Sequence, residues 1–319
     1  VVSAQVICWV AEFALDSWFH IPLFSIPSAV LIILFIGIWR KTHSNDVRVS
    51  ASILFITFLV VLNLIETTAG DWRIAACDVG QGDSILIRTA EHSAVMVDTG
   101  DDPAKLRACL EYFDIEIIQT LVISHIHQDH YGAFEVLDEF RPENVVIPKG
   151  YVTESFRYQL SKIFPEVIVG EAGYGQRHSY GQWHIIQVGE EASDSGTDVN
   201  NSGIVIYAFA GGVDALLLAD IEVTAQQKLV SSAGDWGIDI VKIAHHGSRY
   251  QHPEFAKELK AKIGWVSVGQ DNSYSHPHPE MMALYKAAGT RLFSTEECGH
   301  LYFDSSSKSI LTSRACSEL

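Results

Sequence analysis

The sequence predicts an α/β protein with two sheets covered by helices, preceded by two or three membrane-spanning helices. Three observations lead to this expectation: uncharged apolar stretches near the start, alternating strand and helix patterns from residue 71 onward, and histidine clusters at the ends of predicted strands. The chain has 319 residues, of which 48 % are apolar, so it can bury a sizeable core. We divide it into a membrane-spanning segment, 1–70, and a main domain, 71–319.

Two stretches near the N-terminus have the length and composition of bilayer-spanning helices. Residues 21–39 and 49–65 contain no charged residue, and about 20 apolar residues span a bilayer. Residues 1–19 are also largely apolar but contain two acidic residues, so they complete a third span or lie at the interface. The loop between the two spans is basic, and short basic loops prefer the cytoplasm. We therefore expect a multi-pass protein of the cell (inner) membrane with an extracytoplasmic main domain.

The charge of the chain limits its partners. Lys and Arg total 22 against 39 Asp and Glu, a net charge of −17. Residues 1–70 hold three basic and four acidic residues, which leaves 19 against 35, a net of −16, for 71–319. A domain this acidic does not hold nucleic acid through a broad basic surface. A phosphate substrate would need positive charge supplied at close range.

From residue 71 onward, apolar and β-branched runs alternate with helical patterns. The runs end in Gly, Asp, Pro or Ser and predict strands at 73–79, 84–88, 94–98, 120–124, 144–148, 166–169, 183–189, 203–210, 214–220, 237–245 and 264–269. Apolar residues three and four apart predict helices at 103–113, 132–140, 153–164, 222–232, 253–260 and 279–288. The polar stretch 190–203 predicts an exposed loop. Two sheets covered by helices accommodate this order.

The five cysteines do not indicate a disulfide framework. Their number is odd and no two have CxxC spacing. We therefore expect mostly buried thiols, and a bridge between Cys77 and Cys298 or between Cys109 and Cys316 is the alternative.

The reactive side chains are concentrated in short histidine clusters. Seven of the fourteen histidines fall at 125–130, 245–246 and 276–278. The first cluster, SHIHQDH, follows an apolar strand, and residues two apart face the same side of an extended chain, so His125 and His127 can face one ion. Asp129 and His130, further round the turn, can face a second. Imidazole and carboxylate at this density suit zinc, manganese or iron.

The HxHxDH pattern after a strand resembles the signature of the metallo-β-lactamase fold, an αββα sandwich, and the resemblance covers about residues 71–305. Other motifs follow in the right order: VDTG with Asp98, LLLADIE with Asp220 and IAHHGS with His245 and His246. The resemblance implies that Asp98 supports the metal ligands from behind and that Asp220 bridges two metals.

Longer motifs are similar to the C-terminal part of ComEC-type DNA internalisation proteins, the membrane channels of natural competence. They are DVGQGDSILI, NNSGIVIY, KIAHHGSRY and SVGQDNSYSHPHPE. This resemblance implies that 1–70 is the end of a larger channel domain. It also implies that the main domain is a nuclease degrading one strand of captured DNA. The implied partners are DNA, the membrane, the rest of the channel protein and other DNA-uptake components.

The metal site departs from the parent fold in its first ion position. The parent fold supplies another histidine between the first cluster and the bridging Asp, but the only histidines between 131 and 219 are His178 and His184, and neither lies in a recognisable motif. The family pattern places Asn201 and Ser202 there. We therefore expect two divalent ions, zinc or manganese, with the first site the more weakly occupied.

Adjacent histidines cannot both point inward from a straight strand, so one member of the HHGS motif should ligate metal and the other should line the cleft. Which is which stays open. The working assignment gives the metal ligands as His125, His127, Asp129, His130, Asp220 and His245. It gives the catalytic residues as Asp129, His246 and His276, the supporting residues as Asp98 and Asn201, and the substrate-binding residues as Ser248 and Arg249.

The expected reaction is hydrolysis of a phosphodiester by water activated on a divalent ion. The ions would also offset the negative charge of the domain toward a phosphate. Two other functions stay open. One is a hydrolase of this fold that acts on another ester or phosphodiester. The other is a non-catalytic DNA-binding or transport module with a vestigial site.

Overall fold

The computed structural model describes residues 69–319 apart from 141, 150, 151, 166, 173–177, 181, 182, 189–198, 233–236 and 271, together with 39, 49–53 and 55. The chain divides into two compact units, Val1–Thr68 and Ala69–Leu319. Most of the predicted spans, 21–39 and 49–65, therefore lies outside the described residues. Within the described part of the chain, no helix is both long enough and apolar enough to cross a bilayer.

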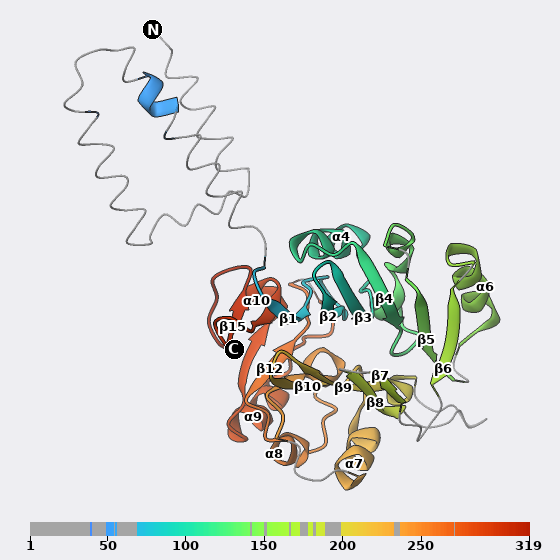
Figure 1. The fold of residues 1–319 in the computed structure, drawn as a ribbon. Coiled ribbons are helices and arrows are strands. Elements are labelled where there is room, and N and C mark those ends of the chain that lie inside the picture. Colours follow the sequence, from blue (N-terminus) through green and yellow to red (C-terminus); the bar gives the residue numbers. More distant parts are fainter. Residues whose placement is uncertain are drawn as a thin grey trace. The chain divides into compact units, whose positions relative to one another are not determined.

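The unit Ala69–Leu319 contains two sheets stacked face to face with helices on their outer faces (Figure 1). The eight-stranded sheet has the order β15-β14-β1-β2-β3-β4-β5-β6. Its strands are β1 (Trp72–Ala76), β2 (Ile85–Ala90), β3 (Ser93–Val97), β4 (Ile117–Val122), β5 (Asn144–Pro148), β6 (Ile168–Ala172), β14 (Leu301–Asp304) and β15 (Ser309–Thr312).

The second sheet has seven strands in the order β13-β12-β11-β10-β9-β8-β7. They are β7 (His178–Tyr180), β8 (Trp183–Val188), β9 (Ile204–Ala210), β10 (Val213–Leu217), β11 (Ile240–Lys242), β12 (Ile263–Val266) and β13 (Arg291–Ser294). The predicted αββα sandwich is confirmed.

Three apolar clusters hold the layers together. One lies under α4 (Pro103–Tyr112), the 3₁₀ helix η1 (Phe134–Asp138) and α6 (Glu154–Ile163). The second lies between the two sheets. The third lies under α7 (Val223–Ser232), α8 (Phe255–Leu259) and α9 (Pro279–Ala287). Short helices α5 (Gln128–Tyr131), η2 (Asn200–Ser202), η3 (Ala244–Gly247) and α10 (Thr295–Cys298) lie in the connections.

The structure differs from the sequence prediction mainly at short elements. The predicted helix 132–140 is the 3₁₀ helix η1, preceded by α5. The predicted strand 237–245 ends at Lys242, and the two histidines after it lie in η3. The strands β13, β14 and β15 have four residues each and were not predicted, because runs this short carry little periodicity.

Strand direction separates the two edges of the sandwich. β3 to β6 are parallel to one another, and so are β10 to β13. The residues that follow β3, β4, β10 and β11 include Asp98, His125, Asp220 and His246, and they meet at the carboxyl edge. We call this the metal edge. The other, which we call the opposite edge, carries the first residues of β10 to β13.

The expectation of buried thiols is wrong for four of the five cysteines. Disulfides join Cys77 to Cys109 and Cys298 to Cys316. The alternative pairings are also wrong, because the residue after β1 lies beside α4, and the end of α10 lies beside the C-terminal segment. Cys8 lies outside the described residues.

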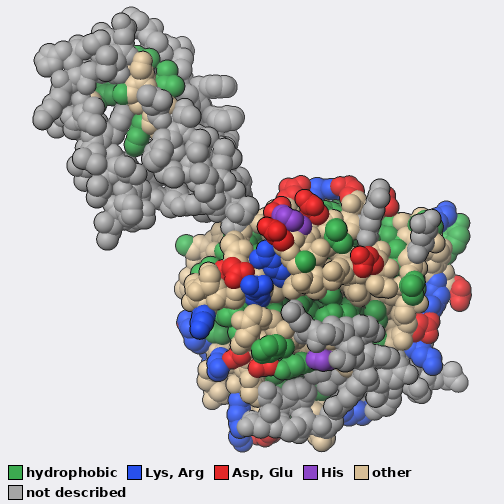
Figure 2. All heavy atoms as spheres, viewed as in Figure 1, with side chains coloured by type: hydrophobic (Ala, Val, Ile, Leu, Met, Phe, Trp, Pro, Cys, Tyr) green, Lys and Arg blue, Asp and Glu red, His purple; other side chains and the backbone are tan. Residues whose placement is uncertain are grey.

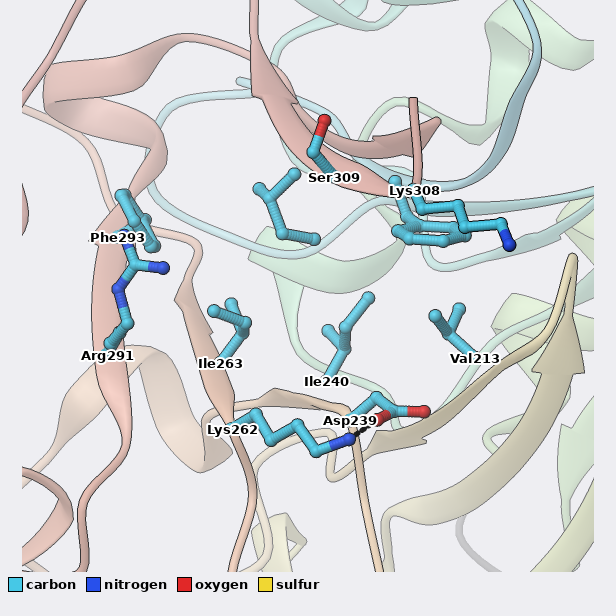
Figure 3. A pocket seen from close by; sticks show the side chains of 11 residues that line it. Val213, Asp239, Ile240, Lys262, Ile263, Arg291, Phe293, Lys308 and Ser309 are labelled. Atoms are coloured by element: carbon cyan, nitrogen blue, oxygen red, sulfur yellow. Dashed lines mark hydrogen bonds and ion pairs between the residues drawn. The ribbon is translucent and has the colours of Figure 1, made fainter. Parts of the chain in front are cut away.

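The opposite edge holds a pocket of about 490 Å³ between the two sheets. Figure 3 shows Val213, Ile240 and Ile263, the first residues of their strands, side by side on one wall, with Lys308 and Ser309 across the gap. The side chains of Lys262 and Arg291 lie at its rim, where they pair with Asp239 and Glu318.

The charged side chains of the unit are interspersed at its surface. On the face drawn in Figure 2, acidic and basic groups alternate, and the described side chains form no broad basic surface there. This agrees with the net charge of −16 that the sequence assigns to residues 71–319.

Candidate metal centre

Four side chains from three separate loops converge at the metal edge. Asp129 and His130 follow β4, Asp220 follows β10 and His246 follows β11, and each offers an atom within 4.8 Å of the others. His130 Nε2 lies 3.3 Å from Asp220 Oδ1, and His246 Nε2 lies 3.4 Å from Asp220 Oδ2 and 3.2 Å from Asp129 Oδ2. Three of the four residues are buried and Asp129 is partly exposed, so the group forms the base of an open site.

Behind this group, Asp98 fixes the orientation of His130. Its Oδ2 lies 2.8 Å from His130 Nδ1, and its Oδ1 accepts a 2.7 Å hydrogen bond from the backbone N–H of Ser124. With Nδ1 engaged, Nε2 of His130 is directed at the site. This is the arrangement by which a carboxylate orients a ligating histidine.

A buried lysine ties a second carboxylate to the group. Lys242, at the end of β11, is 1 % exposed, and its Nζ contacts Asp83 and donates to the carbonyl of Ala219 at 3.2 Å. Nζ also lies 3.8 Å from Asp220 Oδ1. Asp83 in turn approaches His246 Nδ1 at 3.3 Å. A buried charge is tolerated when it is paired, and this pairing holds two metal-edge loops together.

The loop that carries Asp83 sits close against the first histidine cluster. The N–H of Asp83 donates to the carbonyl of Asp129 at 3.2 Å. A Cβ on Gly82 would lie 2.1 Å from that carbonyl oxygen, and Gly82 also has φ +123°. Only glycine allows this approach. Gly82 therefore allows the close packing of these two loops.

His245 and His246 adopt a left-handed turn, with φ values of 48° and 50°. Because the backbone is not a straight strand here, both side chains line the same pocket. His246 is buried and belongs to the four-residue group, whereas His245 is partly exposed, and its Nδ1 lies 2.9 Å from Glu222 Oε1. The geometry therefore favours His246 over His245 as the metal ligand, the reverse of the working assignment.

Charge–charge interactions within the group favour the protonated, positively charged forms of His130 and His246. Burial opposes protonation of His130, but Asp220 and Asp98 outweigh it and raise the pKa to about 10. Burial likewise opposes protonation of His246, whose pKa Asp220 and Asp83 nevertheless raise. Burial opposes ionisation of Asp220, but His246 and His130 hold its pKa well below its usual value. A site that binds protons this strongly is one that would stabilise a cation.

The first predicted ion position is less complete. His125 Nε2 lies 3.1 Å from His127 Nδ1 and 3.9 Å from Asp220 Oδ2. Asn201 is not aimed at this pair, because its Oδ1 accepts from the N–H of Glu222 at 2.9 Å. His184 stacks on Tyr207. These contacts agree with an incomplete first ligand set.

Above these residues lies a pocket of about 320 Å³, lined by Gln81, His127, Gln128, Asp129, Asp220, His245, His246, Tyr274 and His276. Burial, with smaller contributions from His246 and His245, lowers the pKa of His276 to about 4. His278 instead accepts from the N–H of Glu280 at the start of α9. Ser248 is buried below the turn, and Arg249 lies over the ring of Tyr250. Neither belongs to the pocket lining.

Several residues of the site were not predicted as functional. They are Lys242, Glu222, Gln81, Gln128 and Tyr274. A signal existed for Lys242, a lone charge inside an apolar run, and for Glu222, an acidic residue two positions after Asp220. Gln81 and Tyr274 lie in loops and Gln128 begins α5, and the convergence of the three depends on the fold.

Residues 77–249 match the model of the Metallo-beta-lactamase superfamily. ComE operon protein 3 of Bacillus subtilis is 26 % identical over 299 residues, which cover 86 % of this chain and 38 % of that protein. Competence protein ComA of Neisseria gonorrhoeae is 27 % identical over 240 residues, 72 % of this chain and 32 % of that protein. The chain thus spans about a third of the length of these relatives.

Among solved structures, the metallo-beta-lactamase fold protein YhfI of Bacillus subtilis is similar with a TM-score of 0.46 and 12 % identity. The similarity covers 70 % of this chain and 96 % of YhfI.

Proposed function

The chain belongs to the metallo-beta-lactamase superfamily of metal-dependent hydrolases, and we propose that it is a phosphodiesterase that degrades one DNA strand during uptake across a membrane. The observation that carries the proposal is the group Asp129, His130, Asp220 and His246 at the base of an open pocket. The names of its competence-protein relatives support the process in which it would act.

The residues present fit a divalent ion. Among the described residues, Nε2 of His130, Nε2 of His246 and Oδ1 of Asp220 are buried and have no hydrogen-bond partner. Leaving three such atoms without a hydrogen bond is costly, and a metal bound between them would remove the cost. Imidazole and carboxylate ligands in this number suit zinc or manganese. His125 and His127 would hold a second, more weakly bound ion.

A divalent ion bound at this group would supply Lewis acidity toward a phosphate and lower the pKa of a water molecule. The chain's own residues would then provide orientation and proton transfer. Asp98 lies 2.8 Å from Nδ1 of His130, and the carbonyl of Ser267 lies 3.0 Å from Nδ1 of His246, so both rings are held from the side away from the site. Asp129 is only partly buried and lines the pocket, so its carboxylate would be accessible to a bound substrate.

Two further histidines line the pocket, where they can take part in proton transfer. Glu222 engages Nδ1 of His245, which leaves Nε2 directed toward the pocket, 3.8 Å from Asp220 Oδ2. His276 stands beside it, with ring centroids 5.5 Å apart. Because the pKa of His276 is about 4, this ring is neutral at pH 7 and can accept a proton. We assign His246 to the metal and His245 with His276 to proton transfer.

The proposed location is outside the cytoplasm, behind the predicted spans 21–39 and 49–65, at the end of a larger channel protein. The two disulfides support this side, because disulfides persist in oxidising compartments and are rare in the cytosol. Blocking free thiols before and after reduction in protein isolated from cells tests it. We expect four additional thiols after reduction. If reduction exposed no additional thiol, the extracytoplasmic location would be contradicted.

The nuclease proposal is tested with residues 69–319, which form a compact unit with their own apolar cores. Single- and double-stranded DNA are incubated with the protein and Mn²⁺ or Zn²⁺, beside Asp129→Ala. A matched control is Asp239→Ala, which removes an aspartate at the opposite edge. Metal-dependent cleavage that is lost in Asp129→Ala and kept in Asp239→Ala is expected. Turnover of small esters without DNA cleavage would overturn the nuclease assignment, and absence of bound metal would overturn the enzyme assignment.

A further inference from the structure

One exposed aromatic side chain stands at the mouth of the metal pocket. Tyr274 lines the pocket and is 66 % exposed. Its ring stacks on His276, with centroids 5.8 Å apart and planes inclined by 26°. The exposed part of the ring lies at the pocket, where it is available to a planar group of a bound ligand.

The loop that carries Tyr274 is held firmly. The side chain of Asn272 accepts from the N–H of His276 at 2.9 Å and donates to the carbonyl of the same residue at 2.8 Å, which closes the turn around Tyr274. The N–H of His278 donates to the carbonyl of Gly247 at 2.8 Å, which attaches the loop to the histidine turn. The ring is therefore positioned before any ligand arrives, which lowers the entropy cost of binding to it.

The pocket offers little else to hold a polyanion. Its described lining contains neither Lys nor Arg. The phosphate would meet the metal, and any additional affinity must come from another part of the substrate. Gln81, which also lines the pocket, has a buried Oε1 without a hydrogen-bond partner among the described residues. An aromatic face and a spare amide acceptor are what a nucleobase with an exocyclic amine can use.

We propose that Tyr274, supported by His276, is a stacking surface for one nucleobase, so that the enzyme acts on single-stranded nucleic acid in preference to duplex. A base inside a duplex already has neighbours on both faces and cannot stack on a side chain without being unstacked. A base of a single strand is free to do so. This inference rests on the proposed function and assigns the substrate class to the same site.

The test compares cleavage of three substrates by residues 69–319 with Mn²⁺: a single-stranded oligodeoxynucleotide, its blunt duplex, and a strand of equal length made of abasic residues. Stacking of one base contributes about 1–3 kcal/mol, so Tyr274→Ala should lower kcat/KM on the single strand about 5- to 150-fold. Wild type should lose a similar factor on the abasic strand. Tyr274→Ala should add no further loss there, because no base remains to stack.

Two variants separate recognition from structure. Tyr274→Phe keeps the ring and should restore the rate that Tyr274→Ala loses. Tyr158→Ala removes another exposed tyrosine, 61 % exposed on α6 and outside the pocket lining, and should leave kcat/KM unchanged. An equal loss on abasic and normal strands in Tyr274→Ala would overturn the inference, since it would mean that Tyr274 only positions His276. Unchanged cleavage in Tyr274→Ala would also overturn it. No cleavage by wild type would overturn the proposed function and this inference together.

Discussion

The two edges of the sandwich are built from the same strands and differ in almost every other respect. The metal edge buries carboxylates, imidazoles and one lysine against each other. The opposite edge surrounds its pocket mostly with Val, Ile and Phe side chains, and two of its charged groups, Lys262 and Arg291, pair with acidic residues at the surface (Figure 3). The metal edge also contains both disulfides.

The opposite edge contributes mainly to the stability of the fold, whereas the metal edge holds the residues of the candidate chemistry. At the opposite edge, each apolar side chain lowers the free energy by being removed from water. At the metal edge, buried charge is costly unless it is paired, so each residue depends on its partners. We therefore expect substitutions at the metal edge to change activity, metal content or stability strongly, and exposed substitutions at the opposite edge to change stability only slightly.

The largest expected difference concerns activity. Asp220→Ala removes the carboxylate that both His130 and His246 approach, at 3.3 and 3.4 Å. We expect kcat/KM for DNA to fall by about 10³-fold or more, because a metal supplies several kcal/mol of transition-state stabilisation. Metal content measured by elemental analysis should fall as well. Full metal content with full activity would place the centre elsewhere.

Lys242→Met should give the largest loss of stability. It removes the cation that pairs with Asp83 and leaves that carboxylate buried, which costs about 3–5 kcal/mol. Urea unfolding of the metal-free unit measures this. The double variant Lys242→Met with Asp83→Asn removes both charges and should recover a large part of the loss. No recovery would mean that Lys242 acts through packing of its alkyl chain alone.

Acid should weaken the metal edge through His300. Its Nδ1 accepts from the N–H of Asp78 at 2.9 Å, and burial, with Arg314 nearby, lowers its pKa to about 4. In the unfolded chain the pKa of this ring is about 6.5. Between pH 6.5 and 4 the unfolded state therefore binds one more proton than the folded state, and the free energy of unfolding decreases as the pH is lowered. The shift corresponds to about 3 kcal/mol.

His300→Asn is the matched variant, since an amide oxygen can accept the same hydrogen bond and does not titrate. The stability of this variant between pH 6.5 and 4 should fall less than that of wild type by about that amount. Parallel pH profiles of the two proteins would exclude His300 as the cause.

The smallest effect is expected at the opposite edge. Lys308 is exposed at the pocket rim, and Lys308→Ala should change the free energy of unfolding by no more than about 0.5 kcal/mol. DNA cleavage should be unchanged. A loss of cleavage would show that the two edges are coupled.

Sequence patterns predicted the architecture well because its long strands are apolar and its helices are amphipathic. They also predicted the first histidine cluster, since HxHxDH lies in one short segment. They could not assign His245 and His246, because the left-handed turn that brings both into the pocket involves no glycine at either position. Without that turn, alternation along a strand assigns the two side chains to opposite faces.

The cysteine pairing and the role of Lys242 also required the fold. Cys77 and Cys109 are 32 residues apart, and only the position of α4 beside the end of β1 brings them together. Lys242 reads as an interruption of an apolar strand until Asp83, 159 residues away, is seen beside it. The lone charge is visible in the sequence, but a partner at such a distance is not.

The chain enters the unit at Ala69 and begins β1 at Trp72, which pairs with Asp304 at the end of β14. This junction lies at the opposite edge, because the far end of β1 is the one that leads to Asp83. Trp72, where the first strand of the unit begins, is therefore remote from the histidine-lined pocket, and changes at this end of β1 need not alter the pocket lining.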